Sequence, residues 1–144
     1  MMSMERSSDW LLDALEDLDV ARILAREGKY ARSCFHAHEA AEKAVKALLI
    51  RLAGRYEVIH SVEELLRIAK ERIDIPEELF GSASRLDAFY IPPRYPNVWP
   101  SGPSYVHFRE EHAASAIESA TLIVDLVKRR LGVEHQHRGA GSAR

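Results

Sequence analysis

The sequence predicts an all-α fold, an antiparallel up-and-down bundle of about five helices. Three observations support it. Apolar residues recur at spacings of three and four, glycines and capping residues separate these stretches, and no segment alternates with the period of a strand. With 144 residues, the chain is long enough for one domain with its own core. We expect a helical bundle over residues 9–132, an N-terminal tail over 1–8 and a disordered C-terminal tail over 133–144.

The first helix is expected to begin near Trp10, because Ser7, Ser8 and Asp9 are all residues that cap helices. Its apolar positions return at helical spacing. Gly28 is expected to end this helix in a left-handed conformation.

The second helix is the longest and is expected over residues 30–53, before Gly54. One seam of this helix follows the spacing of a bundle interior: Cys34, His38, Ala41, Val45, Leu48 and Leu52. A flank of small residues, which allows close approach of a neighbouring helix, consists of Ala37, Ala40, Ala44 and Ala47. His38 lies on the apolar seam, which favours a hydrogen-bonded core or rim histidine over a catalytic one.

Two short helices follow. Ser61 and Glu64 have the spacing of a capping box, which predicts a helix that ends near Ile73. Pro76 suits a first helical position, which predicts another helix over residues 76–90.

The last helix is expected to start within residues 104–108 and to end before Gly132. Its apolar seam includes Val106, Ala113, Ile117, Ala120, Val124, Val127 and Leu131. Three basic residues in its final turn, Lys128, Arg129 and Arg130, complement the negative end of the helix dipole.

Between these last two helices lies YIPPRYPNVWPSGPSY, residues 90–105, which we call the proline loop. Pro93 and Pro96 stiffen the backbone around Arg94, so that its side chain is presented at little entropic cost. Arginine suits bidentate contact with phosphate, and Tyr95 is placed to stack on a base. The loop therefore predicts a nucleotide or RNA-end site. The alternative is that its aromatic residues plug the end of the bundle.

His107, Arg109 and His112 occupy the first turns expected for the last helix. Backbone N–H groups at a helix start favour an anion. Histidine suits acid–base work at neutral pH. These three residues are accordingly the candidates for catalysis, should the protein be an enzyme.

The composition excludes several classes of protein. A formal net charge of −2 gives no overall basic field for tight, sequence-independent binding to long nucleic acids. Cys34 is the only cysteine, so an intramolecular disulfide and a multi-thiolate zinc site are excluded. The sequence has no apolar run of ~18 residues, so it predicts no membrane span. We expect a cytoplasmic protein. Few amides beside many charged residues suggest a thermophile.

The seven histidines do not form a recognisable metal motif. HExxH is absent, and no histidine–carboxylate cluster is evident from the spacing. No glycine-rich loop for phosphates is present either. The sequence therefore predicts no metal site and no cofactor.

Four segments resemble the HEPN (higher eukaryotes and prokaryotes nucleotide-binding) domain: SCFHAHEAAEKAVKALL, HSVEELL, YIPPRYP and AASAIESATLIVDLV. The resemblance covers residues 9–132. It implies an up-and-down bundle that dimerises, and a partnership with a separately encoded minimal nucleotidyltransferase in a toxin–antitoxin-like pair. The site residues that it implies are Glu42, Lys43, Lys46, Arg94 and Tyr95.

Many HEPN domains are also metal-independent ribonucleases of toxin or defence systems, with Arg-x(4–6)-His at the start of the last helix. This sequence departs from that motif, because only two residues separate Arg109 from His112. We therefore interpret it first as a non-catalytic binding module. The alternatives are a ribonuclease, with Arg94 or Arg109 on the phosphate and His107 or His112 as the base, and a purely structural interaction protein.

Overall fold

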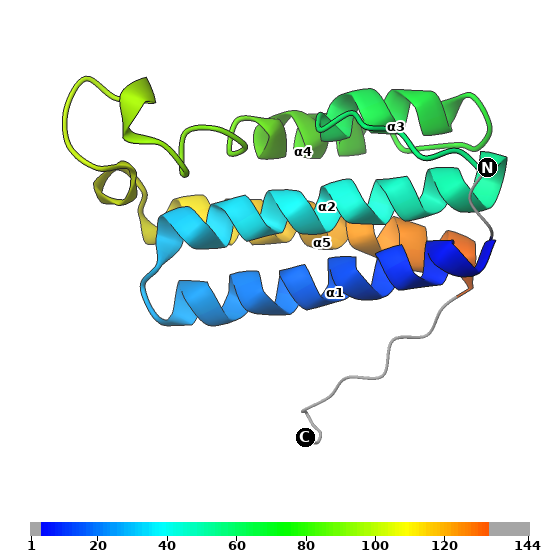
Figure 1. Ribbon diagram of the computed structural model, residues 1–144, viewed down its shortest axis with the longest axis horizontal. Helices are drawn as coiled ribbons and strands as arrows, with labels where there is room; N and C mark the ends of the chain where they lie inside the picture. Colours follow the sequence, from blue (N-terminus) through cyan, green and yellow to red (C-terminus); the bar gives the residue numbers. More distant parts are fainter. Residues whose placement is uncertain (1–3, 133–144) are drawn as a thin grey trace, which may run out of the picture.

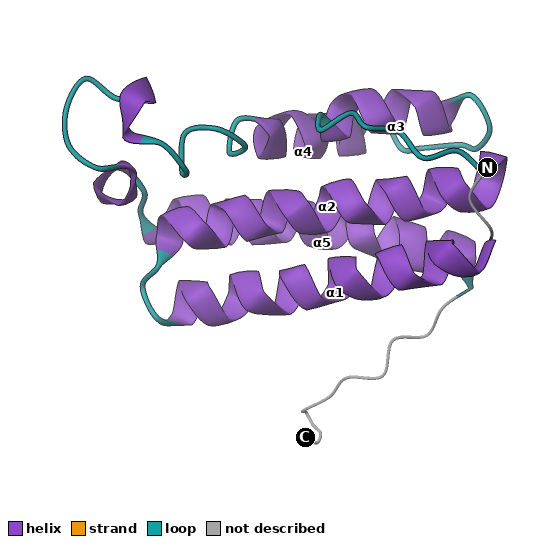
Figure 2. Cartoon of the chain, viewed as in Figure 1, coloured by secondary structure: helices purple, strands orange, loops and turns teal. Residues whose placement is uncertain are grey.

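The computed structural model describes residues 4–132. Its five α-helices are α1 (Met4–Arg26), α2 (Tyr30–Ala53), α3 (Val62–Lys70), α4 (Glu78–Asp87) and α5 (Glu110–Leu131). Two short 3-10 helices, η1 (Pro96–Val98) and η2 (Ser104–His107), lie before α5. Residues 4–132 contain no strand, and the predicted all-α fold is confirmed (Figure 2).

The central element of the bundle is α2, which contacts all four other α-helices. Figure 1 shows α1, α2 and α5 as long rods side by side, with α3 and α4 covering another face of α2. The chain reverses direction from α1 to α2, from α3 to α4 and again from α4 to α5, so that α5 runs in the same direction as α2 (Figure 1). The predicted up-and-down arrangement is confirmed. No helix in the described part of the chain is long and apolar enough to cross a membrane.

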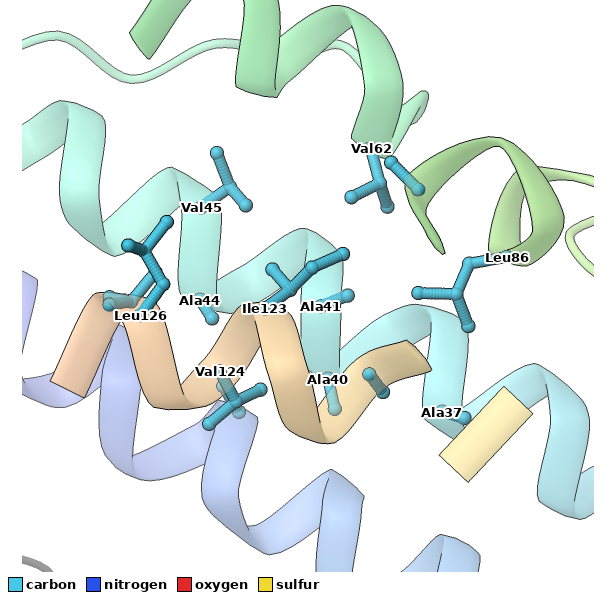
Figure 3. Packing of buried hydrophobic residues seen from close by; sticks show 14 of the residues in the cluster. Ala37, Ala40, Ala41, Ala44, Val45, Val62, Leu86, Ile123, Val124 and Leu126 are labelled. Atoms are coloured by element: carbon cyan, nitrogen blue, oxygen red, sulfur yellow. The ribbon is translucent and has the colours of Figure 1, made fainter. Parts of the chain in front are cut away.

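The core follows the pattern predicted for α2, whose bounds match the prediction. The four alanines of its small-residue flank are all fully buried. Figure 3 shows Ala40 and Ala44 close to Val124 and Ile123 of α5. Because the side chain of alanine is a single methyl group, the backbones of α2 and α5 can approach closely along this small-residue flank.

Two predicted helix ends are confirmed, one by a side-chain hydrogen bond and the other by its backbone angles. Ser61 Oγ accepts a hydrogen bond from the Glu64 backbone N–H at 3.1 Å, which caps the start of α3. Gly54 has a φ of 64°, and its N–H donates to the Ile50 carbonyl at 2.8 Å. A side chain at this position would strain the backbone.

The start of α1 differs from the prediction. This helix begins at Met4 and therefore takes in part of the segment expected to be a tail. Ser7 does not cap the helix but lies buried within it, and Arg51 Nε of α2 donates to its Oγ at 3.2 Å. Arg6 and Asp9, one turn apart, form an ion pair at 2.7 Å. Packing against α2 thus carries the helix past the residues that would locally have capped it.

The other helix ends differ by a few residues. Helix α3 ends at Lys70, before Ile73, and α4 spans Glu78–Asp87, within the predicted 76–90. At the last helix, η2 forms first. Phe108 then takes an extended conformation, with φ −115° and ψ 140°, so that α5 begins only at Glu110. The proline loop and η2 lie together at one end of the bundle (Figure 1).

Candidate functional site

The histidines predicted as catalytic candidates lie in an aromatic cluster at the end of the bundle. The His107 ring stacks on Trp99, with centroids 3.9 Å apart and planes 7° apart. Its Nε2 lies 3.0 Å from the Ser101 carbonyl oxygen. Trp99 also meets Phe108, a buried residue, edge to face. This part of the loop does plug the bundle, as the alternative interpretation expects.

His112 belongs to the same region. Its Nδ1 accepts a hydrogen bond from the Arg109 backbone N–H at 2.9 Å, so the neutral ring carries its proton on Nε2. The ring packs edge-on against Phe108 and Phe89. The structure therefore brings Arg109 and His112 together through the Arg109 backbone.

Arg94, the predicted phosphate ligand, lies among three aromatic rings. Its guanidinium carbon is 4.4 Å from the Tyr90 ring centroid and 5.0 Å from those of Phe35 and Tyr95. Arg94 Nε donates to the Tyr90 carbonyl at 2.9 Å. Within residues 4–132, its two terminal nitrogens have no hydrogen-bond partner and no carboxylate within 4.0 Å. The rings hold the guanidinium in place, and the part of the chain that the structure describes leaves its outer N–H donors unpaired.

Tyr90 connects this arginine to a second group of side chains. Its ring stacks on His60 at a centroid distance of 5.2 Å and lies 5.0 Å from the His38 ring. Tyr90 thus does not join the aromatic plug, which the alternative interpretation of the loop expected. It lies instead against α2 and the segment that precedes α3.

His38 is fully buried, as its place on the seam predicted. Its Nε2 lies 3.1 Å from Asp87 Oδ1 at the end of α4. Burial alone would lower the pKa of His38. The hydrogen bond to Asp87 and the nearby carboxylates of Glu39 and Glu42 outweigh burial and raise the pKa of His38 above the ordinary value.

Asp87 is the most connected carboxylate of the site. It accepts hydrogen bonds from Ser61 Oγ at 2.8 Å and from the backbone N–H groups of Val62 at 2.7 Å and Glu63 at 3.1 Å. Burial raises the pKa of Asp87, but these bonds and His38 outweigh burial and lower it. The carboxylate stays charged and caps α3 from another part of the chain.

Glu42 and Lys46, both predicted for ligand binding, form a buried ion pair. Their Oε2 and Nζ are 2.8 Å apart, with side-chain exposures of 7% and 2%. His60 Nδ1 lies 3.1 Å from the same oxygen. Lys46 Nζ also lies 5.1 Å from the Tyr56 ring and 6.0 Å from that of Trp10.

Lys43, the remaining predicted ligand residue, has a different partner. Its ammonium lies 2.7 Å from Asp17 of α1. Burial lowers the pKa of Lys43, but the bond to Asp17 raises it overall. The structure therefore pairs each of the two predicted lysines with a carboxylate.

The expectation that no histidine–carboxylate cluster exists is wrong. One side-chain atom each from His38, Glu39 and Glu42 lies within 4.8 Å of the other two. These residues form the stretch HEAAE on α2, in which positions i and i+4 share one helix face. That spacing was the available signal.

His60, Tyr90 and Asp87 were also missed as site residues. His60 directly precedes the capping Ser61, and Tyr90 is the first residue of the proline loop, so neither position by itself indicated a site. Asp87 carried no local signal, because its partners Ser61 and His38 are 26 and 49 residues away in sequence.

The sequence profile of the HEPN domain matches residues 7–130, almost the whole described chain. The protein belongs to the HEPN domain family. The resemblance read from the four sequence segments is thereby confirmed, as is the bundle that it implied.

Solved structures of similar proteins agree with this HEPN assignment. TT1696 from Thermus thermophilus has a TM-score of 0.83 and 38% identity, over 87% of this chain and 98% of that protein. ST0689, described as an archaeal HEPN homologue, has a TM-score of 0.72 and 34% identity, over 91% and 99% of the two chains.

A Methanocaldococcus jannaschii protein named "Putative toxin MJ1304" is 28% identical over 127 residues, which cover 80% of this chain and 81% of that protein.

Proposed function

We propose that this HEPN domain is the binding module of a toxin–antitoxin-like pair. It holds the phosphate of a nucleotide or an RNA end at the proline loop, and it acts as a dimer with a separately encoded minimal nucleotidyltransferase. The relative named as a toxin supports the toxin-like role. The family supports a nucleotide-related ligand.

The observation that carries the proposal is the state of Arg94. Its guanidinium is held by three aromatic rings, and its outer donors have no described partner. A preorganised arginine loses little side-chain entropy when it binds a phosphate. Tyr95, adjacent to it and 48% exposed, provides a ring on which a base can stack.

The two lysines contribute less directly. Lys43 and Lys46 each neutralise a carboxylate, Asp17 and Glu42 respectively. Their charges are therefore already balanced, and we assign them to the fold around the site. Arg94 and Tyr95 remain as the groups that touch the ligand.

Binding of ATP and of a short 5′-phosphorylated RNA, measured by calorimetry and by fluorescence anisotropy, tests this function. Arg94→Ala should weaken binding roughly 10-fold to 100-fold, the effect of losing a charge-assisted hydrogen bond. Arg67→Ala is a matched control. Arg67 also lies over a ring, that of Phe80 at 4.5 Å, but its guanidinium is paired with Glu63 at 3.0 Å.

Equal affinities of wild type and a folded Arg94→Ala protein would remove Arg94 from the site. The partnership needs a separate measurement. Co-purification with a minimal nucleotidyltransferase from the same genome, and light scattering of the chain alone, would report the complex and the dimer. A monomer that captures no such enzyme would contradict this part of the proposal.

A metal-independent ribonuclease is the second candidate, favoured by the position of His60. Its Nδ1 is bound to Glu42, and its ring stacks on the tyrosine over which Arg94 also lies. An arginine for the phosphate and a histidine for proton transfer thus meet at Tyr90. RNA cleavage in EDTA that His60→Ala and Arg94→Ala abolish, and His107→Ala does not, would support it.

A further inference from the structure

Two buried polar atoms face each other on α2 without a hydrogen-bond partner among residues 4–132. They are Nδ1 of His38 and Oε1 of Glu42, 3.8 Å apart. Oε2 of Glu39 lies 3.9 Å from the same nitrogen. Unpaired polar atoms in a protein interior are costly, so such a group calls for a partner.

We propose that His38, Glu39 and Glu42 bind one zinc ion. The proposal does not depend on nucleotide binding at Arg94. It adds a metal site to a chain whose sequence predicted none.

The distances suit this metal. Ligands of a tetrahedral zinc ion with bonds of about 2.1 Å are about 3.4 Å apart. His38 Nδ1 lies 3.8 Å from Glu42 Oε1 and 3.9 Å from Glu39 Oε2, and all three ligand atoms lie within 4.8 Å of one another. Three protein ligands leave the fourth position to water, as in open zinc sites.

The opposite side of the imidazole is arranged as in many metal sites. Because a carboxylate can only accept, the contact with Asp87 places a proton on His38 Nε2. The lone pair of a neutral ring then lies on Nδ1 and points among carboxylate oxygens. A histidine ligand oriented by a second carboxylate is the usual arrangement around zinc.

The charge around the site favours a cation as well. Four carboxylates lie in the connected network: Asp17, Glu39, Glu42 and Asp87. In the described part of the chain, two lysines balance them, Lys43 and Lys46. With neutral histidines, the carboxylates of this network outnumber its ammonium groups, and a divalent ion would offset the excess negative charge. The side chain of Glu39 is 22% exposed, which gives the ion a route from solvent.

Zinc titration of the EDTA-treated, dialysed full-length chain tests the site. Calorimetry and elemental analysis should give one tightly bound zinc per chain. The protein should carry His135→Gln and His137→Gln, so that histidines of the C-terminal tail do not contribute. A cobalt-loaded sample should show the absorption of a tetrahedral ion, which reports ligands in direct contact with the metal.

Glu39→Gln decides between a metal and a proton at this site, because this partly exposed side chain can change without a cavity. It should weaken zinc binding at least 10-fold, whereas Glu63→Gln, at another exposed carboxylate, should not. Asp87→Asn should weaken it about 10-fold to 100-fold. Absence of zinc binding, or equal affinity in Glu39→Gln, would overturn the proposal and assign a proton to His38 Nδ1.

Discussion

Nε2 of His38, in the first half of α2, lies 3.1 Å from Oδ1 of Asp87, the last residue of α4. The same carboxylate accepts the N–H groups of Val62 and Glu63 in the first turn of α3. One side chain therefore joins three helices around the candidate site.

Asp87→Ala should lower the free energy of unfolding by about 2–4 kcal/mol, because it removes a distant helix cap and leaves His38 without its partner. Chemical denaturation followed by circular dichroism measures this change. Asp87→Asn keeps one acceptor oxygen and should cost less. A loss below about 0.5 kcal/mol in the alanine variant, the level of an ordinary surface substitution, would contradict the role of Asp87.

Patterns within a short stretch of sequence predicted the parts of the fold that depend on neighbouring residues. The bounds of α2 followed from apolar spacing and a terminal glycine, and the cap at Ser61 followed from a spacing of three residues. The phosphate-binding role of Arg94 remains a prediction. The structure adds that its outer donors are unpaired among residues 4–132.

The rest of the candidate site depends on contacts between distant segments. The apolar seam predicted a hydrogen-bonded core or rim histidine at position 38, and this is confirmed. The identity of its partner could not be predicted, because Asp87 is 49 residues away. Similarly, α1 begins at Met4, before its expected caps, and one of these residues, Ser7, contacts Arg51 of α2 instead. Neither effect has a signature within one helix.

The Asp17–Lys43 pair should make stability depend on acidity. Burial raises the pKa of Asp17, but the bonds to His36 and Lys43 lower it below the ordinary 3.8. A lowered carboxyl pKa adds stability above the unfolded value, and this stability is lost as the pH falls through the folded value. Wild type should thus lose part of its stability between about pH 5 and pH 2.

The matched variant for this pH dependence is Asp17→Asn, which has nearly the same shape and does not titrate. Unfolding free energies measured across that range should fall less steeply with acidity for Asp17→Asn than for wild type. Parallel pH profiles of the two proteins would show that Asp17 contributes no such stability.

The buried pair of Lys46 and Glu42 should behave as a coupled unit. Lys46→Met should cost about 3–5 kcal/mol, because Glu42 would keep a buried charge without its ammonium partner. The double variant Lys46→Met/Glu42→Gln removes both charges and should cost less than the sum of the single changes. Thermal and chemical unfolding in EDTA measure this cycle without a contribution from metal binding.

A coupling energy within about 0.5–3 kcal/mol is expected for residues in direct contact. Lys46 also packs against Trp10 and Tyr56, and methionine keeps much of that apolar contact, so lost packing alone would give additive losses. Additivity would therefore mean that the ammonium contributes little and that Lys46 acts through its stem. Coupling would show that the charge of Lys46 is committed to Glu42 and is not available to a ligand.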